Sequence, residues 1–226
     1  MTNDQPIDES TALTACQNSL ENFKNCLVSR VDPANLTLKS KIPFKLFSLK
    51  ELLLHRMTAL ADSALTLYES NRRVPSFLVI RGCMETTGSI VHIRKKCESY
   101  LENKDLDSFD ESLMKGLAGG RDKKAKFVAV NVLSLIDKID REYPGYRKMY
   151  DVLCEYTHPN FFGVLDVFGK IDPKQVWLDL GDEIRKPPAA YGLAPLLMSM
   201  TIFEESYNIV DDLGHQINDW LDQKAA

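Results

Sequence analysis

Apolar residues recur at intervals of three and four positions along most of the chain, a pattern typical of amphipathic helices. It predicts helices over about residues 10–30, 48–71, 75–101, 108–118, 127–143, 144–157 and 190–221. Two capping boxes, Ser48–Glu51 and Ser108–Glu111, are predicted to begin the second and fourth of these helices. Residues 31–47 contain two prolines and show no period, so we expect a surface loop there.

Strand character is confined to residues 163–181. Two runs of residues typical of strands, Val164–Phe168 and Val176–Leu180, are joined by Gly-Lys-Ile-Asp-Pro-Lys, which predicts a β-hairpin. An isolated hairpin is only marginally stable, so we expect its apolar face to pack against the helices. That face should carry Val176, Leu178 and Leu180.

Two features of the predicted helices concern their neighbours. The helix over 75–101 contains Gly82 and Gly88, which indicate close approach of another backbone or a partner that needs the space. The C-terminal helix carries apolar residues close to a heptad spacing. This seam either packs within the monomer or joins two copies of the chain, and the pattern alone favours neither.

Together these elements predict a mainly α protein, a single-domain helical bundle of six or seven helices with one small β-hairpin. The domain should span residues 10–226, after a disordered segment at 1–9. A chain of 226 residues with 44% hydrophobic content is long enough to bury one core.

The formal net charge of −4 gives no indication of general nucleic-acid affinity. The charge is unevenly spread, however. Residues 121–148 hold eight basic side chains against four acidic ones, whereas residues 201–226 hold six acidic side chains against one basic. The basic middle and the acidic end could face one another within the chain, or two copies of the chain could use this asymmetry to pair.

The five cysteines are far apart, with no C-x-x-C motif, and indicate neither a disulfide framework nor a zinc site. Buried thiols in a reducing cytoplasm are the expected state. The first ten residues are acidic and polar, which is not typical of a signal peptide. The most apolar run, Ala189–Phe203, is shorter than the roughly 20 residues of a membrane span, so we expect a soluble, cytoplasmic protein.

Candidate chemistry gathers in two places. Arg81 and Glu85 lie four residues apart and therefore share one helix face, where they could hold a phosphate or form an ion pair that braces two helices. His158 precedes Pro159 and must leave helical geometry. Its imidazole could act as a general acid or base, or it could interact with the helix C-terminus. Cys154, four residues before His158, is more typical of a core thiol than of a nucleophile.

Two segments, LVIRGCMETTGSIVHI and YDVLCEYTHPNFFGVLDVFGKID, resemble helical bacterial proteins of the broad HEPN-like group. They cover about 40 residues. The resemblance implies a helical bundle that often dimerises, and many members of the group are metal-independent ribonucleases in toxin, defence or RNA-processing systems. HEPN ribonucleases typically carry Arg, a polar residue and His within about two helical turns. Here each candidate pair, Arg81 with His92 and Arg147 with His158, is separated by eleven residues.

The leading expectation is thus a HEPN-like protein of an RNA- or defence-related process, with Arg81, Glu85 and His158 as a candidate metal-independent ribonuclease site. Secondary binding residues would be Asn160, Tyr156 and Arg147. The alternative is a non-catalytic, dimerising interaction or adaptor module. Neither requires a metal or cofactor, and the expected partners are a second copy, RNA or a cognate protein. Convergence of the three site residues in an open cleft would favour the ribonuclease, and burial in mutual contacts would favour the module.

Overall fold

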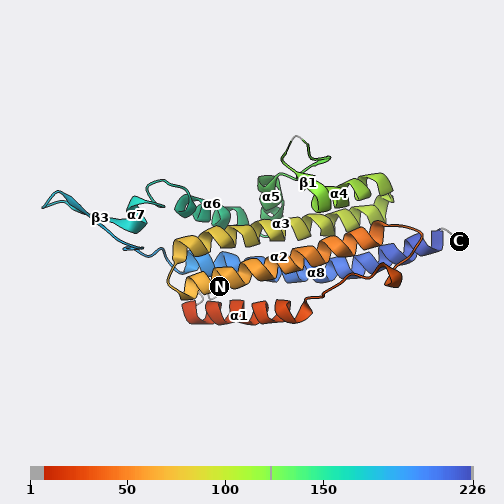
Figure 1. The fold of residues 1–226 in the computed structure, drawn as a ribbon, viewed down its shortest axis with the longest axis horizontal. Coiled ribbons are helices and arrows are strands. Elements are labelled where there is room, and N and C mark those ends of the chain that lie inside the picture. The colour runs from red at the N-terminus through yellow and green to blue at the C-terminus, as the bar shows by residue number, and fades with distance from the viewer. Residues whose placement is uncertain (1–7, 123, 225–226) are drawn as a thin grey trace, which may run out of the picture.

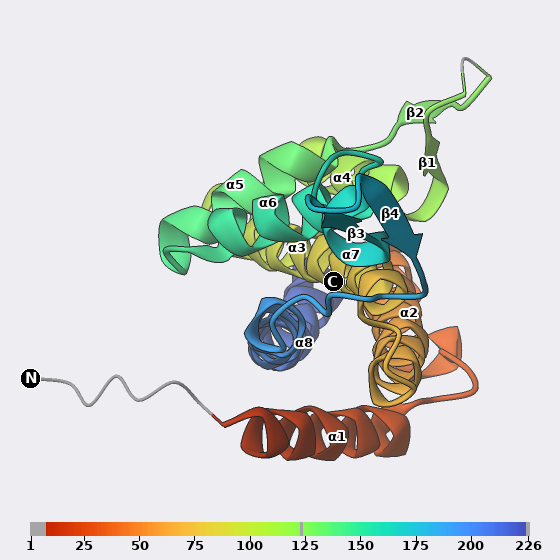
Figure 2. The same cartoon turned by 90° about the vertical axis from the view of Figure 1, so that its left-hand side faces the viewer.

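Helix α3 (Arg73–Asn103) lies at the centre of the molecule, and five other helices contact it. In the computed structural model, which describes residues 8–122 and 124–224, α3 runs beside two other long helices, α2 (Ile42–Glu69) and α8 (Ala190–Lys224) (Figure 1). Helix α1 (Glu9–Cys26) packs on α2 and α8 from one side. On the opposite side, Figure 2 shows three shorter helices over α3: α4 (Leu106–Ala118), α5 (Val132–Glu142) and α6 (Tyr146–Thr157).

The remaining elements are small. A 3₁₀ turn (Pro33–Asn35) precedes α2, and a two-residue parallel pair joins β1 (Gly119–Gly120) to β2 (Phe127–Val128). Helix α7 (Leu165–Phe168) leads into an antiparallel hairpin of β3 (Gly169–Asp172) and β4 (Trp177–Leu180). The prediction of a mainly α bundle is confirmed, and α7 raises the number of helices in the described residues to eight. None of the helices in that part of the chain is long and apolar enough to cross a membrane.

The predicted starts of several helices are wrong. Helix α2 begins at Ile42 rather than at Ser48, because a proline in the first turn needs no backbone N–H partner. Glu51 does not close a capping box there, since its carboxylate accepts a hydrogen bond from the hydroxyl of Tyr207 in α8 (2.8 Å). Helix α4 begins at Leu106 rather than at Ser108, and α5 begins at Val132 rather than at residue 127. The side chains of Asp105 and Asn131 cap the two helices at these starts.

At the termini, α1 begins at Glu9, one residue before the expected start. The predicted disordered segment falls mainly on residues 1–7, which lie outside the described part of the chain.

Gly82 and Gly88 allow other helices of the same chain to approach α3. A Cβ on Gly88 would lie 2.9 Å from the Cβ of Leu135 in α5, and one on Gly82 would lie 3.2 Å from a methyl carbon of Leu60 in α2. Both distances are shorter than ordinary contacts between carbon atoms. The glycines therefore serve packing inside the bundle, where they make room for leucine side chains of α2 and α5 rather than for another backbone or for a partner.

The N-terminus of α3 is capped from far along the chain. The backbone N–H groups of Arg73 and Val74 each donate to the carboxylate of Glu183 at 2.9 Å. Glu183 is only 6% exposed, and its negative charge also interacts favourably with the helix dipole. This contact attaches the segment after the hairpin to the bundle.

The heptad seam of α8 packs within the monomer. Its members are buried against α1, α2 and α3, apart from the partly exposed Tyr207. Because these side chains already belong to the core, the seam offers no surface to a second copy. The buried members are Leu193, Leu196, Met200, Phe203, Val210, Ile217 and Leu221.

The hairpin differs from the prediction in both register and packing. The expected first strand is the helical turn α7, and β3 occupies residues expected to be the connection. The hairpin projects from one end of the bundle (Figure 1), and Val176, Leu178 and Leu180 are 88%, 46% and 77% exposed. The prediction that these side chains pack on the helices is therefore wrong. Alternation identifies residues that share a face of a strand but cannot tell whether another element covers that face.

Replacing Leu178 with Asp should change the free energy of unfolding by less than about 0.5 kcal/mol, because its side chain is half exposed and leaves no cavity. The same change at Leu196, which is 1% exposed, should cost about 3 kcal/mol or more by placing an unpaired charge in the core. Urea titrations at concentrations where the chain is monomeric provide the comparison. An equal loss in the free energy of unfolding for the variants at Leu178 and Leu196 would contradict the exposed position of the hairpin.

Candidate functional site

Arg81 and Glu85 lie on the side of α3 that faces α6. Helix α6 begins after Gly145, where the carboxylate of Asp140 accepts hydrogen bonds from the backbone N–H groups of Gly145 and Arg147, both at 3.0 Å. The helix ends at Thr157, because His158 precedes a proline and adopts an extended backbone. Helix α6 lies over the N-terminal half of α3, where its side chains contact Phe77, Arg81 and Met84 (Figure 1).

A chain of hydrogen bonds connects the two helices. The guanidinium of Arg81 donates to the hydroxyl of Thr157 (2.9 Å) and to the phenol oxygen of Tyr150 (3.3 Å). The phenol in turn donates to the carboxylate of Glu85 (2.9 Å). The guanidinium carbon also lies 5.2 Å from the centre of the Tyr150 ring, a cation–π distance. Arg81 and Glu85 are thus joined through Tyr150.

The protonation states suit this arrangement. Burial raises the pKa of the Tyr150 phenol, and the Glu85 carboxylate raises it further against the opposing effect of Arg81. The phenol therefore stays protonated at neutral pH and can donate to Glu85. Burial also raises the pKa of the Cys154 thiol, so a Cys154–His158 nucleophile receives no support.

His158 stands beside this network. Its backbone N–H donates to the carbonyl of Cys154 (2.9 Å) and its carbonyl accepts from Asn160 (2.8 Å), while the side chain is exposed. The neighbouring Thr157 binds Arg81, so the imidazole lies one residue from the guanidinium contact. The structure therefore brings Arg81 and Glu85 together through Tyr150 and leaves the His158 ring at the surface.

The three secondary residues have structural contacts. Asn160 bonds both Glu155 (2.8 Å) and the backbone N–H of Gly163 (3.0 Å), which shapes the turn after α6. Tyr156 is buried and packs edge-on against Phe77.

Arg147 binds the carboxylates of Asp137 and Asp151, on α5 and α6. Its guanidinium is therefore occupied by two carboxylates of its own chain.

Of the candidate site residues, Arg147 lines an open pocket on the surface of α6, together with Asp140 and Asp151. The principal cavities of the described chain are lined by other side chains than Arg81, Glu85 and His158. Within residues 8–122 and 124–224, no group of three or more His, Cys, Asp and Glu side chains is placed to hold a metal ion. Comparisons with family models, with curated proteins and with solved structures found no match for this chain.

Sequence reasoning missed Tyr150 and Thr157 as members of the network. They are seven residues apart, so they share one face of α6 two turns apart. That spacing was a usable signal. Tyr146 belongs to the core, where its hydroxyl bonds that of Ser199 (2.9 Å).

A second candidate site is an apolar surface at the end of the bundle, here called the apolar tip. Residues 161–191 contain ten of the 18 large apolar side chains that are exposed in the described chain. Exposed apolar side chains in such number make this segment a candidate binding surface. The ten are Phe161, Phe162, Val164, Ile171, Val176, Trp177, Leu178, Leu180, Ile184 and Tyr191.

The register of β3 with β4 places the side chains of the hairpin on two opposite faces. Ile171 pairs with Leu178 across the strands, and Leu180 lies two residues further along β4, so all three side chains share one face. The other face carries Lys170 opposite Asp179 and Asp172 opposite Trp177. The hairpin is therefore amphipathic, and its apolar face is open to solvent.

Removing the Arg81 side chain should lower the free energy of unfolding by about 1–3 kcal/mol, because it removes hydrogen bonds that join α3 to α6 beside the half-buried Glu85. His158→Ala should change it by less than about 0.5 kcal/mol, since the imidazole is exposed. Urea unfolding followed by circular dichroism measures both. A loss for His158→Ala that matches Arg81→Ala would contradict the assigned roles.

Proposed function

We propose that the protein is a non-catalytic interaction module that forms a homodimer through the apolar tip. The uncovered apolar face of the hairpin, made by Ile171, Leu178 and Leu180, carries this proposal. These side chains are 59%, 46% and 77% exposed. Full burial of such a side chain contributes about 1.5–3 kcal/mol, so covering several of them supplies a substantial driving force for association.

A second copy of the chain suits this surface for two reasons. The face that carries Ile171, Leu178 and Leu180 contains no charged side chain, so it complements an identical face without repulsion. Residues 161–191 as a whole hold five acidic and four basic side chains, so like-charge repulsion between two tips is small. Two such hairpins can pack face to face about a twofold axis, which gives an isologous interface.

The balance of acidic and basic side chains in the apolar tip disfavours two other binding partners, an anionic membrane and a nucleic acid. Binding to an anionic lipid surface needs an excess of basic side chains around the apolar ones, and so does binding to the phosphates of a nucleic acid. The apolar tip lacks that excess.

Sedimentation velocity from nanomolar to high micromolar concentration tests the proposal. The wild-type chain should shift from monomer to dimer as its concentration rises. The double change Leu178→Asp and Leu180→Asp should weaken association at least about a hundredfold, because each dimer would bury four carboxylates at an apolar interface. Leu38→Asp is the matched control, since Leu38 is 88% exposed but lies outside the tip. A wild-type monomer at every concentration, or equal dimerisation of the double variant, would overturn the proposal.

One observation favours a second candidate, the metal-independent ribonuclease. The Nε atom of Arg81 is buried without a hydrogen-bond partner in the described residues, which leaves one donor free beside the exposed His158. Against it, the other two nitrogens are engaged by Thr157 and Tyr150, and a phosphate would have to displace them.

We therefore expect no cleavage of single-stranded RNA by the purified protein. Cleavage that His158→Ala abolishes without lowering the melting temperature would instead establish the ribonuclease. Contaminating nuclease is excluded if His158→Ala, purified in the same way, is inactive.

A further inference from the structure

A cavity of about 200 Å³ lies between α2, α3, α4 and the segment that leads into α5. Most of its wall is apolar, with Leu49 and Leu53 from α2 and Val132 and Leu135 from α5. An apolar cavity of about 150 Å³ is large enough to hold benzene. This cavity can therefore hold an aromatic ring or a branched chain of similar size.

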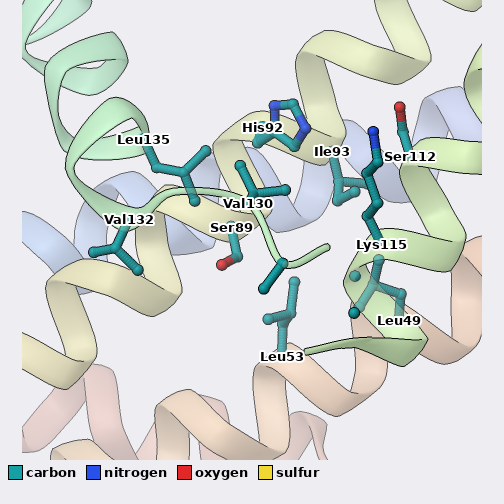
Figure 3. A pocket seen from close by; sticks show the side chains of 13 residues that line it. Leu49, Leu53, Ser89, His92, Ile93, Ser112, Lys115, Val130, Val132 and Leu135 are labelled. Carbon is teal, nitrogen blue, oxygen red and sulfur yellow. The ribbon is translucent and has the colours of Figure 1, made fainter. Parts of the chain in front are cut away.

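Two nitrogen-bearing side chains line the same cavity. Figure 3 shows the His92 imidazole and the Lys115 ammonium toward one side of the view, with Leu49 and Leu53 toward the other. The half-buried His92 ring makes no hydrogen bond with the described residues. Among the residues that the structure describes, Lys115 forms an ion pair with Glu111 alone, one turn earlier on α4 (2.8 Å). Such a surface pair is weak and leaves the ammonium available to a ligand.

The surroundings of His92 are positively charged. Burial lowers the pKa of His92, and the charges of Lys138, Lys96, Lys115 and Lys95 lower it further, to about 4. These lysines come from α5, α3 and α4, whereas α2 contributes the uncharged side chains of Leu49 and Leu53 to the cavity. Glu142 pairs with Lys95 and Glu111 with Lys115, whereas Lys96 and Lys138 form no ion pair in the described residues. A negative charge would therefore be stabilised here.

We propose that this cavity binds a small organic carboxylate with an apolar body, either a ring or a short branched chain. The body lies against Leu49, Leu53 and Leu135, and the carboxylate lies between the Lys115 ammonium and the His92 imidazole. A carboxylate fits better than a phosphate ester, because one side of the cavity offers two nitrogen donors and most of the remaining wall is apolar. The hydroxyls of Ser89 and Ser112, which also line it, already donate to backbone carbonyls of their own helices. The site is separate from the apolar tip, and the inference does not depend on the proposed dimer.

Benzoate is the probe, with benzyl alcohol as its uncharged counterpart. Proton NMR should show saturable shifts of the His92 ring signals with benzoate, assigned by their loss in His92→Gln. The pKa of His92 should rise when benzoate is bound, because the carboxylate stabilises the imidazolium. Benzyl alcohol should bind at least about tenfold more weakly and leave that pKa unchanged. Equal binding of the two probes would overturn the carboxylate as ligand class.

Two changes locate the ligand. Val130→Trp should fill the cavity and abolish binding, with Ala129→Leu as the smaller change if the first variant does not fold. Lys115→Met removes the charge but keeps the apolar stem and should weaken benzoate about tenfold. Lys148→Met is the control for Lys115→Met. Lys148 is exposed on α6, away from the cavity, and its replacement changes the net charge by the same amount.

Three outcomes of these binding measurements would overturn the site. Binding that survives a folded Val130→Trp or Ala129→Leu variant, or that Lys148→Met weakens as much as Lys115→Met, would overturn the site. The absence of any His92 shift at millimolar benzoate would do the same.

Discussion

Close packing around α3 is the constraint on which the rest of the structure depends. Because five helices contact α3, it must present small residues where its neighbours cross, and Gly82 and Gly88 do so for α2 and α5. Small hydroxyl side chains serve the same end. Ser76 donates to the carbonyl of Ala64 in α2 (2.8 Å), and Thr87 donates to that of Ser199 in α8 (3.0 Å). These two buried hydroxyls of α3 are in this way satisfied by the backbones of its neighbours.

The same packing accounts for the Arg81 network. A charged side chain at the junction of two helices is tolerated only if hydrogen bonds replace water, and Tyr150 and Thr157 supply them. The candidate binding places are those where the packing of the helices leaves apolar surface uncovered or space unfilled. One such place is the hairpin beyond the end of the bundle, and the other is the cavity under α4 and α5.

Much of the fold could be predicted, because helical periodicity reports burial around α3 directly. Helix starts were harder to predict where the cap lies outside the periodic pattern, as with Asp105 and Asn131, or far along the chain, as with Glu183. Spacing within one helix predicted that Arg81 and Glu85 share a face. It could not identify Tyr150 as the residue between them, since that depends on how α6 crosses α3. Alternation likewise predicted that Leu178 and Leu180 share one face of a strand. It could not predict that this face is exposed to solvent.

The apolar face of the hairpin is uncovered in the monomer, and in the proposed dimer the same face of a second copy covers it. Isotope-filtered NMR on a mixture of labelled and unlabelled protein tests this dimer most directly, because it detects only contacts between different molecules. We predict intermolecular NOEs that connect the methyl groups of Ile171 with those of Leu178 and Leu180. A dimer without these NOEs, or with NOEs from other surfaces alone, would contradict the account.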